Sequence, residues 1–108
     1  MVWRIEILDD RVARELHALP ADMQARYLRI ADLLIEFGPI EVGMPYVRPL
    51  EHKLWEIRLS GRSSIGRIVY AAMTGQRLVL LHAYVKKTQS TPRRALAIAR
   101  HRLKEIVA

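Results

Sequence analysis

The chain has 108 residues, no cysteine and a formal net charge of +7. This length predicts one domain, residues 1–108, and the lack of cysteine excludes disulfides and thiolate metal sites. No apolar run approaches the ~20 residues of a membrane span, and no signal-peptide pattern opens the chain, so we expect a cytoplasmic protein with no membrane partner.

The positive charge is unevenly distributed along the chain. Residues 1–47 contain five arginines and eight acidic residues, whereas residues 48–108 contain 13 lysines and arginines and three glutamates. An anionic partner such as nucleic acid is the natural inference, and a solvated basic surface is the simpler alternative. Arginines outnumber lysines fourteen to four, which favours bidentate phosphate contacts.

The N-terminal half reads as a strand followed by two helices. Residues 3–7 alternate apolar and polar side chains, as in a half-buried strand. Asp9 and Asp10 are candidate N-caps for a first helix that ends at Pro20. The second helix is expected to stop at Gly38-Pro39, directly after Phe37. Its apolar stripe, expected in the core, consists of Met23, Tyr27, Ile30, Leu34 and Phe37.

Residues 38–50 contain three prolines, which predicts a loop with a short strand near Tyr46-Val47. Three strand-length apolar runs follow: 54–59, 67–73 and 78–85. The connections between them are too short for a parallel crossover, so they predict an antiparallel meander. The third run is apolar on both faces and is expected to be central. Regular alternation would place Leu78, Leu80, His82 and Tyr84 on one face, opposite Val79, Leu81, Ala83 and Val85.

A last helix is predicted from Thr91-Pro92 onward, because an N-cap residue precedes proline at the first helical position. Its apolar stripe comprises Leu96, Ala99, Leu103 and Ile106. The whole order predicts an α+β fold: strand, helical hairpin, three-stranded meander and C-terminal helix, or β-α-α-β-β-β-α.

The candidate chemistry is basic. The four histidines lack the paired spacing of metal ligands, and no glycine-rich phosphate loop or nucleophile elbow is present. Catalysis would therefore use Arg, Lys, His or Tyr. Such a set suits RNA cleavage, in which the nucleophile is the 2′-hydroxyl of the substrate and the protein supplies orientation, positive charge and proton transfer.

Several motifs make the sequence resemble the RelE/ParE superfamily of bacterial toxins, and most closely its HigB-like, phage-derived branch. They are LWEIR at residues 54–58, GRIVY at 66–70, LLHAYVKKTQ at 80–89 and the Thr91-Pro92 pair. The resemblance covers essentially the whole chain and implies a RelE-like fold.

The resemblance also implies a function and partners. It implies the toxin of a type II toxin–antitoxin system, an endoribonuclease that cleaves mRNA on the ribosome and inhibits translation without a metal or cofactor. The implied protein partner is a cognate antitoxin, usually a helix-turn-helix DNA-binding protein encoded beside the toxin.

Carried over to this sequence, the resemblance assigns a cleaving surface on the sheet. Arg58 and Arg67 are expected to clamp the scissile phosphate. Apart from the resemblance, His82 or Tyr84 is our candidate for proton transfer, because both flank the same strand end. Lys86 is the remaining residue of the catalytic set and is expected to hold a phosphate. The expected RNA-binding residues are Arg48, Lys53, Lys87, Arg93 and Arg94.

Each assignment has a structural alternative. Arg58 could pair with Glu56 or Glu51, Arg67 could be a turn residue, His82 could be a hydrogen-bonded core histidine, and Tyr84 could serve packing alone. Three other readings of the whole chain stay open: a ParE-like inhibitor of DNA gyrase on the same fold, a non-catalytic basic module that binds nucleic acid or protein, and a toxin that has lost its activity.

Overall fold

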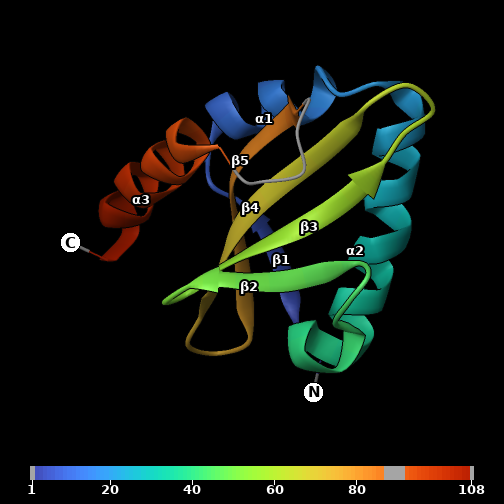
Figure 1. Cartoon of the computed structure of the whole chain (residues 1–108). Coiled ribbons are helices and arrows are strands. Elements are labelled where there is room, and N and C mark those ends of the chain that lie inside the picture. Colours follow the sequence, from blue (N-terminus) through green and yellow to red (C-terminus); the bar gives the residue numbers. More distant parts are fainter. Residues whose placement is uncertain (1, 87–91, 108) are drawn as a thin grey trace.

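A computed structural model describes residues 2–86 and 92–107. A five-stranded sheet has helices on both of its faces (Figure 1). In chain order, the elements are β1 (Arg4–Ile7), α1 (Asp10–His17), α2 (Ala21–Val42), β2 (Val47–Glu51), β3 (Leu54–Ser60), β4 (Ile65–Met73), β5 (Arg77–Lys86) and α3 (Arg93–Val107). This confirms the predicted α+β order. The short strand expected near Tyr46-Val47 is β2, which begins at Val47 and extends to Glu51 at the edge of the sheet.

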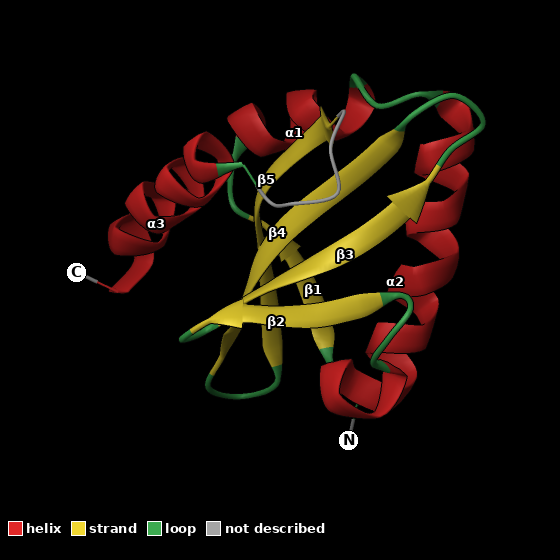
Figure 2. Ribbon diagram, viewed as in Figure 1, coloured by secondary structure: helices red, strands yellow, loops and turns green. Residues whose placement is uncertain are grey.

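The strand order is β1-β5-β4-β3-β2, and the meander β3-β4-β5 is antiparallel as predicted (Figure 2). β1 pairs in parallel with the first part of β5, from Arg77 to Leu80. β5 is therefore central over that part only, because β1 ends at Ile7. Beyond Leu80, β5 has no strand on its β1 side within the described residues.

The two N-terminal helices begin where the sequence indicates. The Asp9 carboxylate accepts hydrogen bonds from the backbone N–H groups of Arg11 and Val12, so Asp9 is the N-cap of α1. α2 departs from helical geometry at Gly38, whose φ of 81° places it in the left-handed region. The predicted stop is thus a kink, because the chain resumes helical geometry at Pro39 and continues to Val42.

The helical hairpin covers one face of the sheet. Val12, Leu16, Met23, Ile30 and Leu34 pack there against apolar side chains of the strands. The sheet contributes Ile57, Leu59, Ile68, Tyr70, Leu78, Leu80 and Ala83. Phe37, expected in this core, is 44% exposed, because it lies at the kink where the helix stripe stops facing the sheet.

The opposite face packs against α3. Leu54, Val69, Ala71, Val79 and Leu81 lie on this face and are buried. From α3 the predicted stripe contacts them: Leu96, Ala99, Leu103 and Ile106. Within the described residues, no helix is long and apolar enough to cross a membrane.

A β-bulge in β5 corrects the predicted alternation of that strand. Val69 of β4 pairs with His82, but the next residue, Tyr70, pairs with Leu80, so Leu81 is an extra residue. Leu78, Leu80 and Ala83 consequently face the helical hairpin. Val79, Leu81 and Tyr84 belong to the opposite face. The predicted sharing of a face by Leu80 and Tyr84 was wrong, because alternation reverses across the bulge.

Candidate RNA-binding face

The sheet face opposite the helical hairpin gathers the basic residues, and adjacent strands contribute to one row across it. Arg58 of β3 pairs with Arg67 of β4, which pairs with Tyr84 of β5. Directly opposed residues of antiparallel strands project from the same face, so these three side chains are neighbours. Arg48 and Lys86 lie on the same face in the rows on either side.

A buried carboxylate lies within this basic set. Glu56 has no exposed side-chain surface and lies on the same face as Arg58, two residues along β3. Its Oε2 accepts a hydrogen bond from the Nε of Arg48 at 2.7 Å and lies 3.6 Å from the Nε of Arg67. Glu56 therefore pairs with Arg48 and Arg67. The alternative in which Arg58 pairs with Glu56 was wrong.

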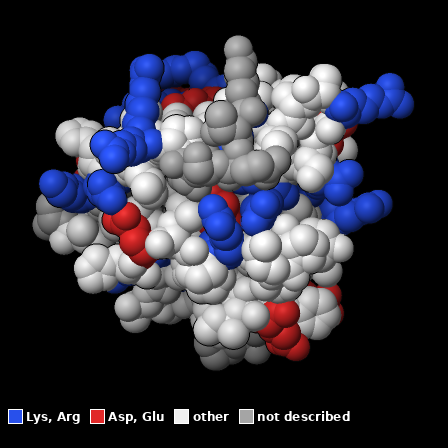
Figure 3. All heavy atoms as spheres, viewed as in Figure 1, with Lys and Arg blue, Asp and Glu red and all other residues white. Residues whose placement is uncertain are grey.

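Around the Arg58–Arg67 pair, this face brings together four cations, Arg48, Arg58, Arg67 and Lys86, and the buried carboxylate of Glu56. Figure 3 shows the face in space-filling form, with basic side chains over the sheet and acidic atoms between them. We call Arg48, Glu56, Arg58, Arg67, Tyr84 and Lys86 the basic cluster. Its excess positive charge in a partly desolvated setting favours an anion.

Burial changes the ionisation of three members of the cluster. It lowers the pKa of the Arg67 guanidinium, against the opposing effect of Glu56. Burial also lowers the pKa of the Lys86 amine, and the nearby charge of Arg67 lowers it further. The pKa of Tyr84 rises to about 12, chiefly through burial and secondarily through the charge of Glu56. The phenol is consequently protonated at neutral pH.

Two polar atoms of the cluster are buried without a hydrogen-bond partner in the described part of the chain: the Nε of Arg67 and the hydroxyl oxygen of Tyr84. Buried polar groups are nearly always satisfied, so such atoms in one place indicate a site for a water, an ion or a ligand. The partners of Arg67 that are present are the carbonyl oxygen of Gly66, which accepts from its Nη1 at 2.8 Å, and Glu56.

Arg58 differs from its neighbour Arg67 in exposure. Its side chain is partly exposed, and its Nη1 lies 3.5 Å from the sulfur of Met44. Arg67 is only 2% exposed. Glu51, the other carboxylate considered for Arg58, instead forms a two-point ion pair with Arg100 of α3. An incoming anion would therefore meet Arg58 at the surface, with Arg67 beneath it.

His82 lies beside the cluster and contacts a different carboxylate. Its imidazole stacks on the Tyr84 ring, with centroids 5.1 Å apart, and its Nδ1 lies 2.9 Å from the Oε1 of Glu15 in α1. A surface hollow between β5 and α3 is lined by His82, Tyr84 and Arg94. His82 is thus a hydrogen-bonded histidine, which was the structural alternative for this residue. Its ring also borders the hollow.

The remaining predicted RNA-binding residues are not all gathered at the cluster. Lys53 is exposed in the β2–β3 turn, five residues from Arg58 along the chain, or about 16 Å at strand spacing. Arg93 and Arg94 are exposed at the start of α3, and only Arg94 borders the hollow beside Tyr84. Lys87 lies outside the described residues, as does Thr91 of the predicted helix start.

The sequence reasoning did not include Glu56 in the site, and it left out Glu15 as well. Glu56 had a detectable signal, because it is an acidic residue two positions from Arg58 on the same face of a mainly apolar strand. Glu15 had none, since its partner His82 is 67 residues away. In the described part of the chain, no three His, Asp or Glu side chains are close enough together to hold a metal ion.

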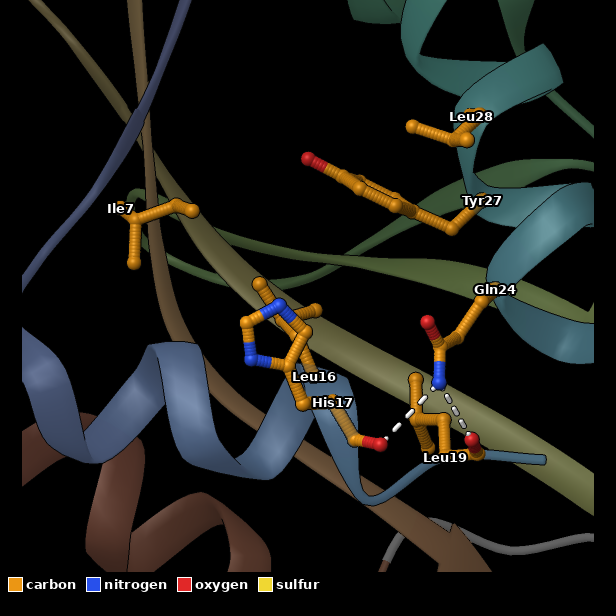
Figure 4. Close-up of a pocket in the computed structure, with 7 residues that line it drawn as sticks. All are labelled: Ile7, Leu16, His17, Leu19, Gln24, Tyr27 and Leu28. Atoms are coloured by element: carbon orange, nitrogen blue, oxygen red, sulfur yellow. Dashed lines mark hydrogen bonds between the residues drawn. The ribbon is translucent and has the colours of Figure 1, made fainter. Parts of the chain in front are cut away.

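A second pocket lies on the other side of the sheet, between β1, α1 and α2 (Figure 4). Tyr27 points across it from α2 toward Ile7 of β1, and the amide nitrogen of Gln24 donates to the carbonyl oxygens of His17 and Leu19. Burial raises the pKa of Tyr27. None of the described residues that line the pocket is an arginine or a lysine, so it does not share the chemistry of the basic cluster.

Comparison with known proteins agrees with this architecture. Residues 14–104 match the family described as Phage derived protein Gp49-like (DUF891), and the chain belongs to that family. An archaeal RelE, solved in a RelE–RelB complex from Pyrococcus horikoshii OT3, superposes with a TM-score of 0.61 at 24% sequence identity. That match covers 79% of this chain and 96% of the archaeal chain.

A second solved structure is a double arginine-to-alanine mutant of the E. coli toxin RelE in the free state. It superposes with a TM-score of 0.58 at 18% identity and covers 99% of this chain and 100% of RelE. No curated protein matches the chain in sequence. The chain thus has the RelE fold, and the resemblance to the RelE/ParE superfamily and its phage-derived branch is confirmed.

Proposed function

We propose that this protein is the toxin of a type II toxin–antitoxin system and that it cleaves mRNA on the ribosome. The observation that carries the proposal is the basic cluster, in which four adjacent strands supply three arginines and a lysine to one face of the sheet. Membership of the Gp49-like family and the RelE fold support the toxin class.

The cluster suits stabilisation of a phosphodiester undergoing attack by its own 2′-oxygen. In that reaction the bond from the 2′-oxygen to phosphorus forms while the bond to the 5′-oxygen breaks, leaving a 2′,3′-cyclic phosphate and a 5′-hydroxyl. Arg58 would contact the phosphate oxygens from the exposed side. Arg67 and Lys86 would add positive charge from beneath, where burial strengthens it.

Two proton transfers accompany this displacement. The leaving 5′-oxygen needs a proton donor, and Tyr84 fits because its pKa of about 12 keeps the phenol protonated. The 2′-hydroxyl needs a base. His82, which stacks on Tyr84, and Lys86, whose pKa burial lowers, are the two candidates among the described residues.

The proposal includes an antitoxin partner. The archaeal neighbour was solved as a complex of RelE with RelB, which supports a cognate antitoxin for this chain as well. We expect a helix-turn-helix protein encoded in the neighbouring reading frame. Co-expression should restore growth and give a complex that co-purifies with this chain.

The decisive experiment uses the purified chain and a defined mRNA, with and without translating ribosomes. We expect cuts only in the presence of ribosomes, with 2′,3′-cyclic phosphate ends on the upstream fragments. Cutting of the same mRNA without ribosomes would instead identify a general ribonuclease. Inhibition of DNA supercoiling by gyrase, with the mRNA left intact, would replace the proposal by the ParE-like alternative.

A further inference from the structure

Glu15 of α1 is the centre of a hydrogen-bond network at the edge of the sheet beside the basic cluster. Its Oε1 accepts from the backbone N–H of Ala83 at 3.1 Å and from the Nη1 of Arg102 at 2.9 Å, and it contacts the Nδ1 of His82 at 2.9 Å. Its Oε2 accepts from the Nη2 of Arg102 at 2.9 Å. The network thus joins α1, β5 and α3.

The ending of β1 explains why a carboxylate lies at this place. β1 pairs with β5 only as far as Leu80, so the backbone beyond it needs other partners. Glu15 caps the N–H of Ala83, and the Nη1 of Arg102 donates to the carbonyl oxygen of Leu81 at 2.8 Å. Residues 81–83, which include the bulge, are thereby fixed by side chains of two helices.

The ionisation of Glu15 determines which imidazole nitrogen carries the proton. Burial alone would raise the pKa of the carboxyl, but the hydrogen bonds from Arg102, His82 and Ala83 hold it below its usual range. An ionised carboxylate only accepts hydrogen bonds, so the Nδ1 of His82 must be the donor. In the neutral imidazole, Nε2 is then the nitrogen with the lone pair.

We propose that Glu15 is a positioning residue for RNA cleavage, and that it holds His82 as the Nδ1–H tautomer so that Nε2 receives the proton of the 2′-hydroxyl. This rests on the proposed function and selects His82 over Lys86 as the base. The ring is fixed in orientation from two sides, by Glu15 at Nδ1 and by the stacked ring of Tyr84, and it borders the hollow that Arg94 also lines.

The first test requires no RNA. Long-range ¹H–¹⁵N spectra of the free, ¹⁵N-labelled protein, recorded from neutral to alkaline pH so that the neutral ring is observed, report which ring nitrogen of His82 is protonated, and His82→Gln assigns the signal. In the neutral ring we expect the proton on Nδ1. A neutral ring with the proton on Nε2 would overturn the proposal. This measurement on the wild-type chain stands whether or not a Glu15 variant folds.

The second test compares Glu15→Gln with Glu105→Gln. Glu105 of α3 pairs with Arg11 of α1, so its variant removes a link between the same two helices without contact to His82. In ribosome-dependent cleavage, Glu15→Gln should lower kcat at least about tenfold with KM little changed. Glu105→Gln should leave both constants within about twofold.

The two proposals fail in different ways. If Glu15→Gln shifts the proton to Nε2 and kcat stays at the wild-type value, the positioning role is wrong while the endonuclease stands. If the wild-type chain cuts no mRNA on ribosomes, the proposed function is wrong, and the tautomer result is unaffected because it was obtained on the free protein.

Discussion

The Nε of Arg67 lies 3.6 Å from the Oε2 of Glu56, and both side chains are almost completely removed from solvent. They project from neighbouring strands on one face of the sheet, where Arg48 reaches the same carboxylate oxygen from β2. Ions buried in this way stabilise a protein only when they remain paired. Glu56 is therefore the counter-charge that allows the basic cluster to exist in the folded chain.

Replacement of Glu56 should destabilise the fold strongly. Glu56→Gln leaves Arg67 buried without its counter-charge, and loss of one partner of a buried pair costs about 3–5 kcal/mol. Urea denaturation followed by circular dichroism measures the free energy of unfolding. Glu51→Gln is the control, because its pair with Arg100 is exposed, and it should have a much smaller effect. Equal stability of the two variants would contradict the role of Glu56.

Arg58→Ala should remove activity and leave the fold intact. The side chain is partly exposed and has no ion pair in the described part of the chain, so its loss breaks no buried pair. Removing one group that stabilises the transition state lowers kcat about 10²–10³-fold. Cleavage on ribosomes and growth arrest on expression are the readouts.

Arg14→Ala provides a matched control for Arg58→Ala, since Arg14 is an exposed arginine of α1. Its variant should cleave mRNA and arrest growth like the wild type. A fully toxic Arg58→Ala variant would remove Arg58 from the site. Reduced thermal stability of Arg58→Ala would assign the residue a structural role instead.

The stability of the protein should fall in acid partly because of Glu15. The folded state lowers the pKa of this carboxyl below its ordinary 4.5, so in that range the unfolded chain binds more protons than the folded one. The contribution of Glu15 is therefore complete above about pH 5 and is lost as the pH falls through the folded pKa. The difference in unfolding free energy between wild type and Glu15→Gln should shrink over this range; a difference independent of pH would contradict it.

Tyr84 should contribute to the stability of the folded protein in the opposite way, with a contribution that is lost as the pH rises. Its pKa rises from 10.0 to about 12 on folding, so the folded state retains a proton that the unfolded chain has lost. The resulting stabilisation is present below the unfolded pKa and disappears as the pH rises through about 12. Tyrosinate absorbance near 295 nm, measured as the pH is raised, should show a late ionisation step in the wild type. That step should be missing in Tyr84→Phe. An unchanged titration curve would disprove the shift.

The order of the helices and strands could be predicted from the sequence, because the local sequence signals agree with the fold. Asp9 marks the start of α1, and the short turns after Ser60 and Met73 allow only antiparallel pairing of β3, β4 and β5. The full length of β2 could not be predicted from the sequence. Its proline, Pro49, argues against a strand in general but is tolerated here because β2 is an edge strand.

The site was predictable only where residues are neighbours through regular pairing. Arg58 and Arg67 could be matched because their motifs lie in adjacent strands, and the structure places them opposite each other. The contacts of His82 could not be predicted, since they depend on Glu15 in a helix far away in sequence. The burial of Arg67 was equally hidden, because it results from packing of several strands together.

The extra residue at Leu81 places two consecutive residues of β5, Leu81 and His82, on the side of the sheet that packs against α3. Deleting Leu81 would give uninterrupted pairing with His82 still opposite Val69 and Tyr84 still opposite Arg67. The polar side chains of β5 would therefore keep their face, and the loss would be the buried Leu81 side chain beneath α3. The length of this strand is thus fixed by packing against α3 and not by the position of the basic cluster.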